Sequence, residues 1–267
     1  MSKVIAVTNQ KGGVGKTTTA INLSASLAAN DYKVLLVDSD PQGNATTGLG
    51  IDKEPGRATI YDALLGDIAL DSIALKTSFE GLDIIPADKN LVAANLELVS
   101  QPRREFRLRE KMNQIRDRYQ YILIDCPPAL DLLTLNDLLA ADSVLIPIQC
   151  EFFALEGISE LFQTIDRIRD SFHHNLQTEG ILLTMFDDRT TLVRQVAADL
   201  RSFFKGEVFR TVIPRNIRLA EAPSYGKSIL SYDVRSKGAE SYIQLAKEIL
   251  SNEQAARRSP KSTGQGS

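Results

Sequence analysis

The chain has little of the residues that mark several specialised classes of protein. Its 267 residues include no tryptophan, two histidines, two cysteines and only 6% aromatic side chains. The cysteines, Cys126 and Cys150, are too few for a disulfide framework and lack the spacing of zinc ligands, so we expect buried, reduced thiols. No segment approaches the roughly 18 apolar residues that a membrane span needs, and no secretory signal precedes the first apolar run. These absences predict a cytoplasmic globular protein that is stabilised by an ordinary hydrophobic core.

Charge is distributed unevenly along the chain, although the formal net charge is only −3. Residues 1–180 contain 17 lysines and arginines against 25 aspartates and glutamates, whereas residues 181–250 contain 11 against 8. A basic C-terminal portion on an acidic body is one way to present a nucleic-acid-binding face. The excess is small enough to arise by chance, so charge alone leaves a nucleic-acid partner open.

Short runs of valine, isoleucine and leucine alternate with longer segments of helical periodicity. Strands without polar alternation are typical of a parallel sheet that is covered on both faces. The order predicts an α/β fold, with a mostly parallel twisted sheet and helices on both faces. We expect strands at residues 4–8, 34–37, 82–85, 121–124, 143–148 and 180–184, with weaker candidates at 208–212 and 228–230. We expect helices at residues 17–29, 91–98, 105–118, 158–169, 192–204 and 239–250.

The same pattern predicts how the chain is organised. Residues 1–250 should form a single domain, and the polar residues 251–267 a disordered tail. Residues 43–56 are rich in glycine, threonine and asparagine and should form a mobile loop. In parallel sheets ligands bind at the carboxyl ends of the strands, so we expect the functional residues there.

A glycine-rich loop follows the first predicted strand and leads directly into a helix. It reads Asn9-Gln10-Lys11-Gly12-Gly13-Val14-Gly15-Lys16-Thr17-Thr18-Thr19. Its glycines let successive N–H groups point inward and form an anion-binding nest, to which the helix N-terminus adds partial positive charge. Lys16 can reach the β- and γ-phosphates of a nucleotide, and the Thr17 hydroxyl can coordinate Mg²⁺. The segment therefore predicts a P-loop of a nucleoside triphosphatase.

Two acidic segments follow predicted strands. One reads Asp38-Ser39-Asp40-Pro41-Gln42-Gly43-Asn44, and the other reads Asp125-Cys126-Pro127-Pro128. Carboxylates at these positions can hold Mg²⁺ through its waters, because this ion dehydrates reluctantly. Asp125 occupies the Walker B position, and Asp38 is either a structural residue or a second partner on the magnesium side.

The P-loop departs from the usual pattern, because Gln10 stands where the first glycine is expected and Lys11 lies inside the loop. It resembles the deviant Walker A motif of the ParA/MinD family of dimerising ATPases, which also includes the nitrogenase iron protein. The resemblance implies ATP and Mg²⁺ as cofactors and a homodimer with ATP sandwiched between its subunits. In that arrangement Lys11 reaches the partner's nucleotide, so hydrolysis depends on dimerisation. The implied catalytic residues are Lys11, Lys16 and Asp40, which orients or activates the attacking water.

The resemblance extends over residues 2–250 and is most specific for the short chromosomal ParA proteins that segregate DNA with a ParB partner. It includes the two acidic segments, Gln149-Cys150-Glu151, Leu183-Thr184-Met185, Ile213-Pro214-Arg215-Asn216 and Ala222-Pro223-Ser224. It implies partition of a chromosome or plasmid, binding of non-specific double-stranded DNA in the ATP state, and ATP hydrolysis stimulated by a ParB-like protein. The location implied is the cytoplasm, on the nucleoid.

The resemblance also assigns residues to each ligand. Phosphate and nucleotide contacts fall on Lys11, Gly12, Gly13, Val14, Gly15, Lys16, Thr17 and Thr18, and adenine contacts on Met185, Pro214 and Asn216. Magnesium contacts fall on Thr17, on Asp125 through water and on Asp38 through water. DNA contacts fall on Arg189 and Arg218, which would give salt-sensitive binding without sequence preference.

Three alternatives remain at this level. The first is a MinD-like positioning ATPase, which needs a C-terminal amphipathic membrane helix that residues 251–267 do not provide. The second is a redox enzyme with an iron–sulfur cluster bridging two subunits through Cys126 or Cys150. The third retains the partition chemistry and moves a protein assembly as cargo.

Overall fold

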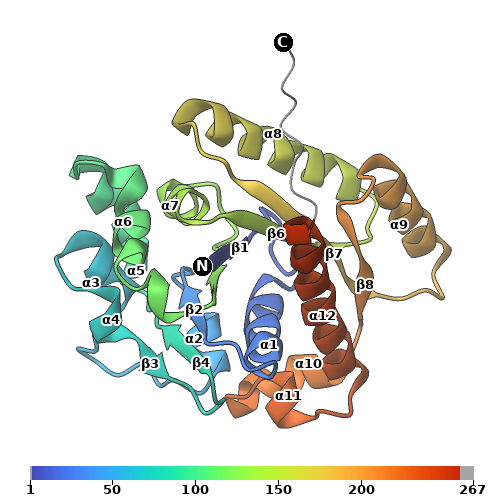
Figure 1. Ribbon diagram of the computed structural model, residues 1–267, viewed down its shortest axis with the longest axis horizontal. Coiled ribbons are helices and arrows are strands. Elements are labelled where there is room, and N and C mark those ends of the chain that lie inside the picture. The colour runs from blue at the N-terminus through green and yellow to red at the C-terminus, as the bar shows by residue number, and fades with distance from the viewer. Residues whose placement is uncertain (1, 259–267) are drawn as a thin grey trace.

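The computed structural model describes residues 2–258 and centres on one eight-stranded sheet (Figure 1). The strand order is β3-β4-β2-β5-β1-β6-β7-β8, and every pairing is parallel except that of β3 with β4. The strands are β1 (Lys3–Val7), β2 (Val34–Asp38), β3 (Leu75–Lys76), β4 (Leu82–Ile85), β5 (Tyr121–Asp125), β6 (Ser143–Gln149), β7 (Gln177–Phe186) and β8 (Val208–Pro214). The predicted α/β fold with a mostly parallel sheet is confirmed.

Twelve α-helices are described between residues 2 and 258. They are α1 (Lys16–Ala28), α2 (Asn44–Gly48), α3 (Ile60–Leu65), α4 (Leu70–Ile73), α5 (Leu91–Glu97), α6 (Arg107–Asn113), α7 (Leu132–Ala140), α8 (Ala154–Phe172), α9 (Thr191–Phe203), α10 (Ile217–Glu221), α11 (Ile229–Tyr232) and α12 (Lys237–Arg258). Short 3₁₀ turns are η1 (Leu98–Ser100), η2 (Arg104–Phe106), η3 (Arg116–Arg118) and η4 (Ala222–Tyr225).

Each face of the sheet carries its own hydrophobic core. Alternate residues of β1 show this, because Val4 and Ala6 belong to one buried cluster, whereas Ile5 and Val7 belong to the other. Helices α3, α5, α6, α7, α8 and α9 contribute to the first cluster, and α1 and α12 contribute to the second. The central strands are therefore buried on both sides, which explains why their sequences lack polar alternation.

Several predicted elements are wrong. Residues 228–230 form no strand, because Ser228 caps α11 and Ile229 donates its backbone N–H to Asn22 Oδ1 at 2.7 Å. Residues 43–56, predicted as a mobile loop, include helix α2. Residues 105–118 do not form one helix, but η2, α6 and η3 in succession.

The predicted tail starts too early. Helix α12 continues to Arg258, and Glu253 forms an ion pair of 2.8 Å with Lys3 at the start of β1. This contact ties the last helix to the edge of the central strands, so residues 251–258 are helical and not disordered. The remaining nine residues of the predicted tail, 259–267, lie outside the described residues. Within residues 2–258, no helix combines the length and the hydropathy needed to cross a bilayer.

Candidate nucleotide site

The glycine-rich loop lies between β1 and α1, at the carboxyl edge of the sheet. Gly13 and Gly15 have positive φ values of 74° and 88°, a conformation that glycine adopts without steric cost. The loop is fixed from its start, because the Asn9 amide donates to the Pro147 carbonyl at 2.8 Å and accepts from the Lys11 N–H at 3.0 Å. Gly15 precedes the first turn of α1, so the N–H groups of this helix end face the loop and form the expected anion cradle.

The two lysines of the loop have different environments. Lys16 is 7% exposed, and its ammonium donates to the Lys11 carbonyl at 3.1 Å. Burial lowers the pKa of Lys16, against the opposing effect of Asp125 and Asp40. The Lys11 side chain is 55% exposed and its ammonium forms an ion pair with Glu151. Lys16 therefore belongs to the chain's own cradle, whereas Lys11 lies outside it.

Asp125 and Asp38 are neighbours, because they pair in register at the ends of β5 and β2. Asp125 is completely buried, and both of its carboxylate oxygens lack a hydrogen-bond partner among the described residues. Burial and the nearby Asp38 raise the pKa of Asp125 well above its usual value, and Thr17 and Lys16 act in the opposite direction. A buried carboxylate without partners is costly unless a cation compensates it. This orphaned group beside Thr17 fits a Mg²⁺ ion that is bound through water.

Asp38 is committed to its own loop. One of its oxygens accepts from both the N–H and the hydroxyl of Thr46, at 2.8 and 2.7 Å, and the other accepts from the Asp40 N–H at 3.2 Å. Of the two roles that the sequence leaves open for Asp38, this geometry favours the structural one. Asp40 is 8% exposed, and one of its oxygens accepts from the Gln42 N–H at 2.8 Å.

A cavity of about 390 Å³ adjoins the P-loop. Gly15 and Thr18 form its phosphate end, and the three residues assigned to adenine, Met185, Pro214 and Asn216, line the same cavity. Much of the remaining wall is apolar and is formed by Ile213, Ile217, Leu219 and Tyr242. The structure thus brings the predicted phosphate and base residues, which are at least 167 positions apart in sequence, to one continuous hollow that suits a purine nucleotide.

Sequence reasoning missed the side chains that hold this hollow together. The Thr184 hydroxyl donates to the Val14 carbonyl at 2.8 Å, and the Gln149 amide donates to the Gly13 carbonyl at 3.3 Å. Tyr242 forms a buried hydrogen bond of 3.1 Å with Thr19 from the distant helix α12. Thr184 and Gln149 lie at the ends of predicted strands. That position was the sequence feature that could have identified them as residues of the site.

The two arginines assigned to DNA lie away from the cradle and are both paired. Arg189, with a side chain 86% exposed, makes two hydrogen bonds to Asp187, and Arg218 pairs with Glu221 at 2.9 Å. The Arg189 guanidinium lowers the pKa of Asp187 to about 2. Both arginines are accessible to a ligand, but each would have to exchange an internal carboxylate for a phosphate.

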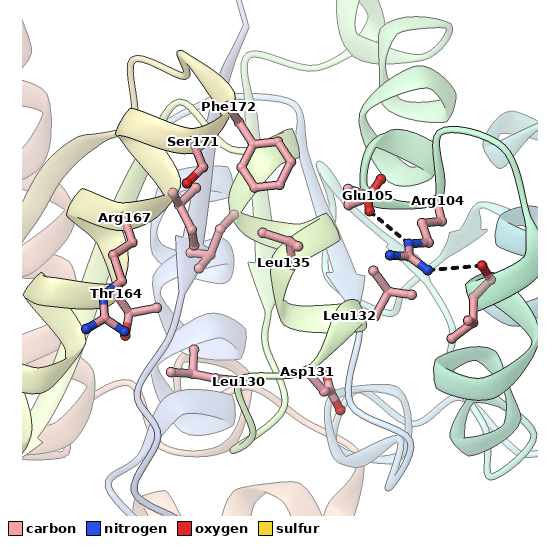
Figure 2. Close-up of a pocket in the computed structure, with 13 residues that line it drawn as sticks. Arg104, Glu105, Leu130, Asp131, Leu132, Leu135, Thr164, Arg167, Ser171 and Phe172 are labelled. Atoms are coloured by element: carbon pink, nitrogen blue, oxygen red, sulfur yellow. Dashed lines mark hydrogen bonds and ion pairs between the residues drawn. The ribbon is translucent and has the colours of Figure 1, made fainter.

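A second cavity, of about 500 Å³, is separate from these residues (Figure 2). Its walls come from α7, α8 and the turns η1 and η2, and they include Leu130, Leu135, Phe172 and the Arg104–Glu105 pair. None of the residues assigned to nucleotide, magnesium or DNA lines it. This cavity therefore has no part in the nucleotide site.

Both cysteines are buried, as expected. Cys126 is fully enclosed beside Asp125, and Cys150 is 6% exposed. Burial raises the pKa of both thiols, that of Cys150 to about 11. Neither thiol lies at a surface where two subunits could share an iron–sulfur cluster, so the structure offers no support for the redox alternative.

The fold and the site together define a P-loop ATPase of the ParA/MinD type. A family model described as "AAA domain" matches residues 2–178. The chain is 52% identical over 250 residues to the chromosome partitioning protein ParA of Myxococcus xanthus, covering 94% of this chain and 88% of that protein. It is also 52% identical over 252 residues to the sporulation initiation inhibitor protein Soj of Bacillus subtilis, covering 94% and 100% of the two chains.

A solved structure gives the same answer for the fold. Cobyrinic acid a,c-diamide synthase from Mycobacterium smegmatis, crystallised with ADP and magnesium, is 34% identical with a TM-score of 0.84, covering 99% of this chain and 100% of that one. The chain belongs to the ParA/Soj family of chromosome-partitioning ATPases.

Proposed function

We propose that the chain is an ATP-dependent dimerising switch for partition of a chromosome or plasmid. The observation that carries the proposal is the position of Lys11. Its side chain is half exposed and held by Glu151, outside a cradle that Lys16 already serves. A lysine in this position is available to a nucleotide bound by a second copy of the chain, which is the role expected of a charge supplied in trans.

The site binds ATP with Mg²⁺, in line with the family and with the ADP and magnesium in the structure of the synthase. Residues Gly12–Thr18 would hold the phosphates, and the cavity between Thr18 and Asn216 would hold adenine. Thr17 and Asp125 would hold the metal, which supplies positive charge against the phosphate oxygens.

The protein's own residues divide the hydrolytic step between them. Lys16 neutralises charge on the phosphates, and Lys11 from the second subunit adds charge only once the dimer has formed. Asp40 orients the attacking water, since its carboxylate lies at the end of β2 beside Asp38 and makes one hydrogen bond to the loop. Hydrolysis removes the group that Lys11 bridges, so the dimer separates.

In the ATP state the dimer would bind non-specific double-stranded DNA through Arg189 and Arg218, and a ParB-like partner would stimulate hydrolysis and release. Arginine contacts to phosphate release counterions, so this binding should weaken steeply with salt. The protein would act in the cytoplasm, associated with the nucleoid, as a single ATPase domain that includes the whole of α12.

Fluorescence anisotropy with a random-sequence duplex tests this function. Binding is measured with ATP, with ADP and without nucleotide, at two salt concentrations. We expect the wild type to bind the duplex only with ATP, and this binding should weaken as salt rises. Asp40→Ala should still bind, whereas Lys11→Ala and Lys16→Ala should not. Arg189→Ala and Arg218→Ala should bind more weakly than the wild type. Glu221→Ala, which removes the nearer of the two carboxylates paired with Arg218 and leaves Asp233 at 3.6 Å, is the matched control and should bind at least as well as the wild type. An ATP-locked dimer without DNA affinity would refute the DNA-tethered switch.

The alternative is a MinD-like or cargo-positioning ATPase that acts on a membrane or a protein assembly. The first form needs an amphipathic membrane-binding helix. Five apolar residues of α12, Ala239, Tyr242, Leu245, Ala246 and Ile249, are buried in the domain. Sedimentation with anionic liposomes and ATP discriminates the two, since pelleting of the protein would favour the membrane form.

A further inference from the structure

The loop that carries Asp40 is tied to helix α7 by a buried carboxylate. The hydroxyl of Ser39, which stands between Asp38 and Asp40, donates to Asp137 Oδ1 at 2.7 Å. The backbone N–H of Ser39 donates to the Asp125 carbonyl at 3.0 Å. Ser39 is thereby fixed on both its side chain and its backbone, one residue from the group that orients water.

Asp137 occupies an unfavourable place for a carboxylate. It is completely buried, and its second oxygen, Oδ2, lacks a hydrogen-bond partner among the described residues. Its helix neighbours Leu133, Leu138 and Leu139 are core residues. A buried carboxylate with an unsatisfied oxygen costs free energy that an apolar side chain would not. Core packing therefore does not explain an aspartate at this position, whereas its contacts with the Ser39 hydroxyl and with the Cys126 thiol do.

Helix α7 is a firm support for such a contact. Asp131 caps its N-terminus by accepting from Leu133 and Thr134 N–H groups at 3.1 and 3.2 Å. Asn136 accepts from the Leu108 N–H at 3.2 Å and donates to the Arg104 carbonyl at 2.8 Å, which joins the helix to η2 and α6. On another side of α7, Leu132, Leu135 and Leu138 line the cavity shown in Figure 2. Helix α7 is thus held by two polar anchors, Asp131 and Asn136, on the N-terminal side of position 137.

The Asp40 loop has a second anchor on its far side. Asp38 holds Thr46, and the Thr46 hydroxyl in turn accepts from the Ala87 N–H at 3.0 Å. Between the two anchors Asp40 shapes its own turn, with the N–H groups of Gln42 and Gly43 donating to its side chain and carbonyl, both at 2.8 Å. The contacts of Asp38 with Thr46 and of Ser39 with Asp137 fix the two residues that precede Asp40. They thereby set the direction in which the Asp40 side chain points.

We propose that Asp137 is a positioning residue for ATP hydrolysis, acting through Ser39 to set the orientation of Asp40. The proposal rests on the role of Asp40 given under Proposed function. Asp137 is buried and does not line the nucleotide cavity, so its loss should lower the rate of the chemical step and leave nucleotide binding in place.

The test compares kcat and KM for ATP in Asp137→Ala, Asp137→Asn, Ser39→Ala and the double alanine variant. We expect Asp137→Ala and Ser39→Ala each to lower kcat about tenfold with KM within about twofold, which is the rate effect of one hydrogen bond. The double variant should be no slower than either single variant, since both break the same contact. Asp137→Asn retains an acceptor oxygen and should restore kcat to within about threefold of the wild type.

Asp83→Ala is the matched control. Asp83 is another buried aspartate, bonded to Tyr119 at 2.8 Å far from the Asp40 loop, and its loss should lower stability without changing kcat. A wild-type kcat in Asp137→Ala, or an asparagine variant as slow as the alanine variant, would overturn the proposal. Asp40→Ala distinguishes failure of this proposal from failure of the proposed function. A fully active Asp40→Ala would overturn the role of Asp40 itself.

Discussion

The Asp38 carboxyl makes folding stability depend on pH in a predictable way. Complete burial raises its pKa from 3.8 to about 6, against the hydrogen bonds from Thr46 and Asp40 that favour the charged form. A raised pKa means that the folded state holds the proton more tightly than the unfolded chain. The contribution of Asp38 to stability is therefore fully present below pH 3.8 and is lost as pH rises through about 6. At 1.36 kcal/mol per pH unit the whole loss is about 3 kcal/mol, of which about 2 kcal/mol falls between pH 4.5 and 7.5.

Urea unfolding of the wild type and of Asp38→Asn, with a chelator and without nucleotide, measures this effect together with the linked change at Asp125, whose pKa the Asp38 charge raises. Asparagine keeps an acceptor oxygen for Thr46 but does not titrate. The unfolding free energy of the wild type relative to the variant should therefore fall by about 2 kcal/mol from pH 4.5 to pH 7.5. A wild-type-minus-variant difference that stays constant over this range would refute the reasoning.

Three further predictions concern single contacts. Glu151→Gln should change the ATP-dependent dimerisation constant by less than about fivefold in sedimentation velocity, because its ion pair with Lys11 is half exposed and such pairs contribute at most about 1 kcal/mol. Asn216→Asp should weaken ATP binding by about five- to tenfold in calorimetry with unchanged stability, since Asp keeps the cap of α10 but loses the amide donor at the base cavity. Gly226→Ala should destabilise the fold by about 2 kcal/mol or more in urea, because its φ is +63° and a Cβ would lie 2.6 Å from Gly50 Cα.

Local patterns were enough to predict the central sheet and the phosphate loop. Six of the expected strands correspond to β1, β2, β4, β5, β6 and β7, because continuous Val/Ile/Leu runs are typical of buried parallel strands. The weaker candidate at residues 208–212 corresponds to β8. Short elements failed for the opposite reason. Residues 228–230 are as apolar as a strand, but a serine cap and the Asn22 side chain hold them in a helical turn. A contact with a residue more than 200 positions away cannot be read from local periodicity.

The tail shows the same limit from another direction. Residues 251–258 are polar enough to predict disorder, yet they continue α12 because Glu253 meets Lys3. The composition of a polar segment indicates that ordering it costs free energy. It does not predict an ion pair with a residue that is distant in sequence and close only in the folded chain.

The site likewise combines residues that lie close together in sequence with contacts that form only when the chain folds. P-loop residues and strand-end carboxylates are recognisable because one loop and two strand ends contain them. The contact of Asp38 with Thr46 and the contact of Ser39 with Asp137, a residue of helix α7 that belongs to no motif, are seen only in the folded chain. Motifs therefore identify the groups that do the chemistry, whereas the residues that orient those groups emerge only when helix α7 is packed beside the end of β2. If the Ser39–Asp137 contact supports kcat as proposed, part of the hydrolysis rate depends on helix α7, which contributes no residue to the wall of the nucleotide cavity.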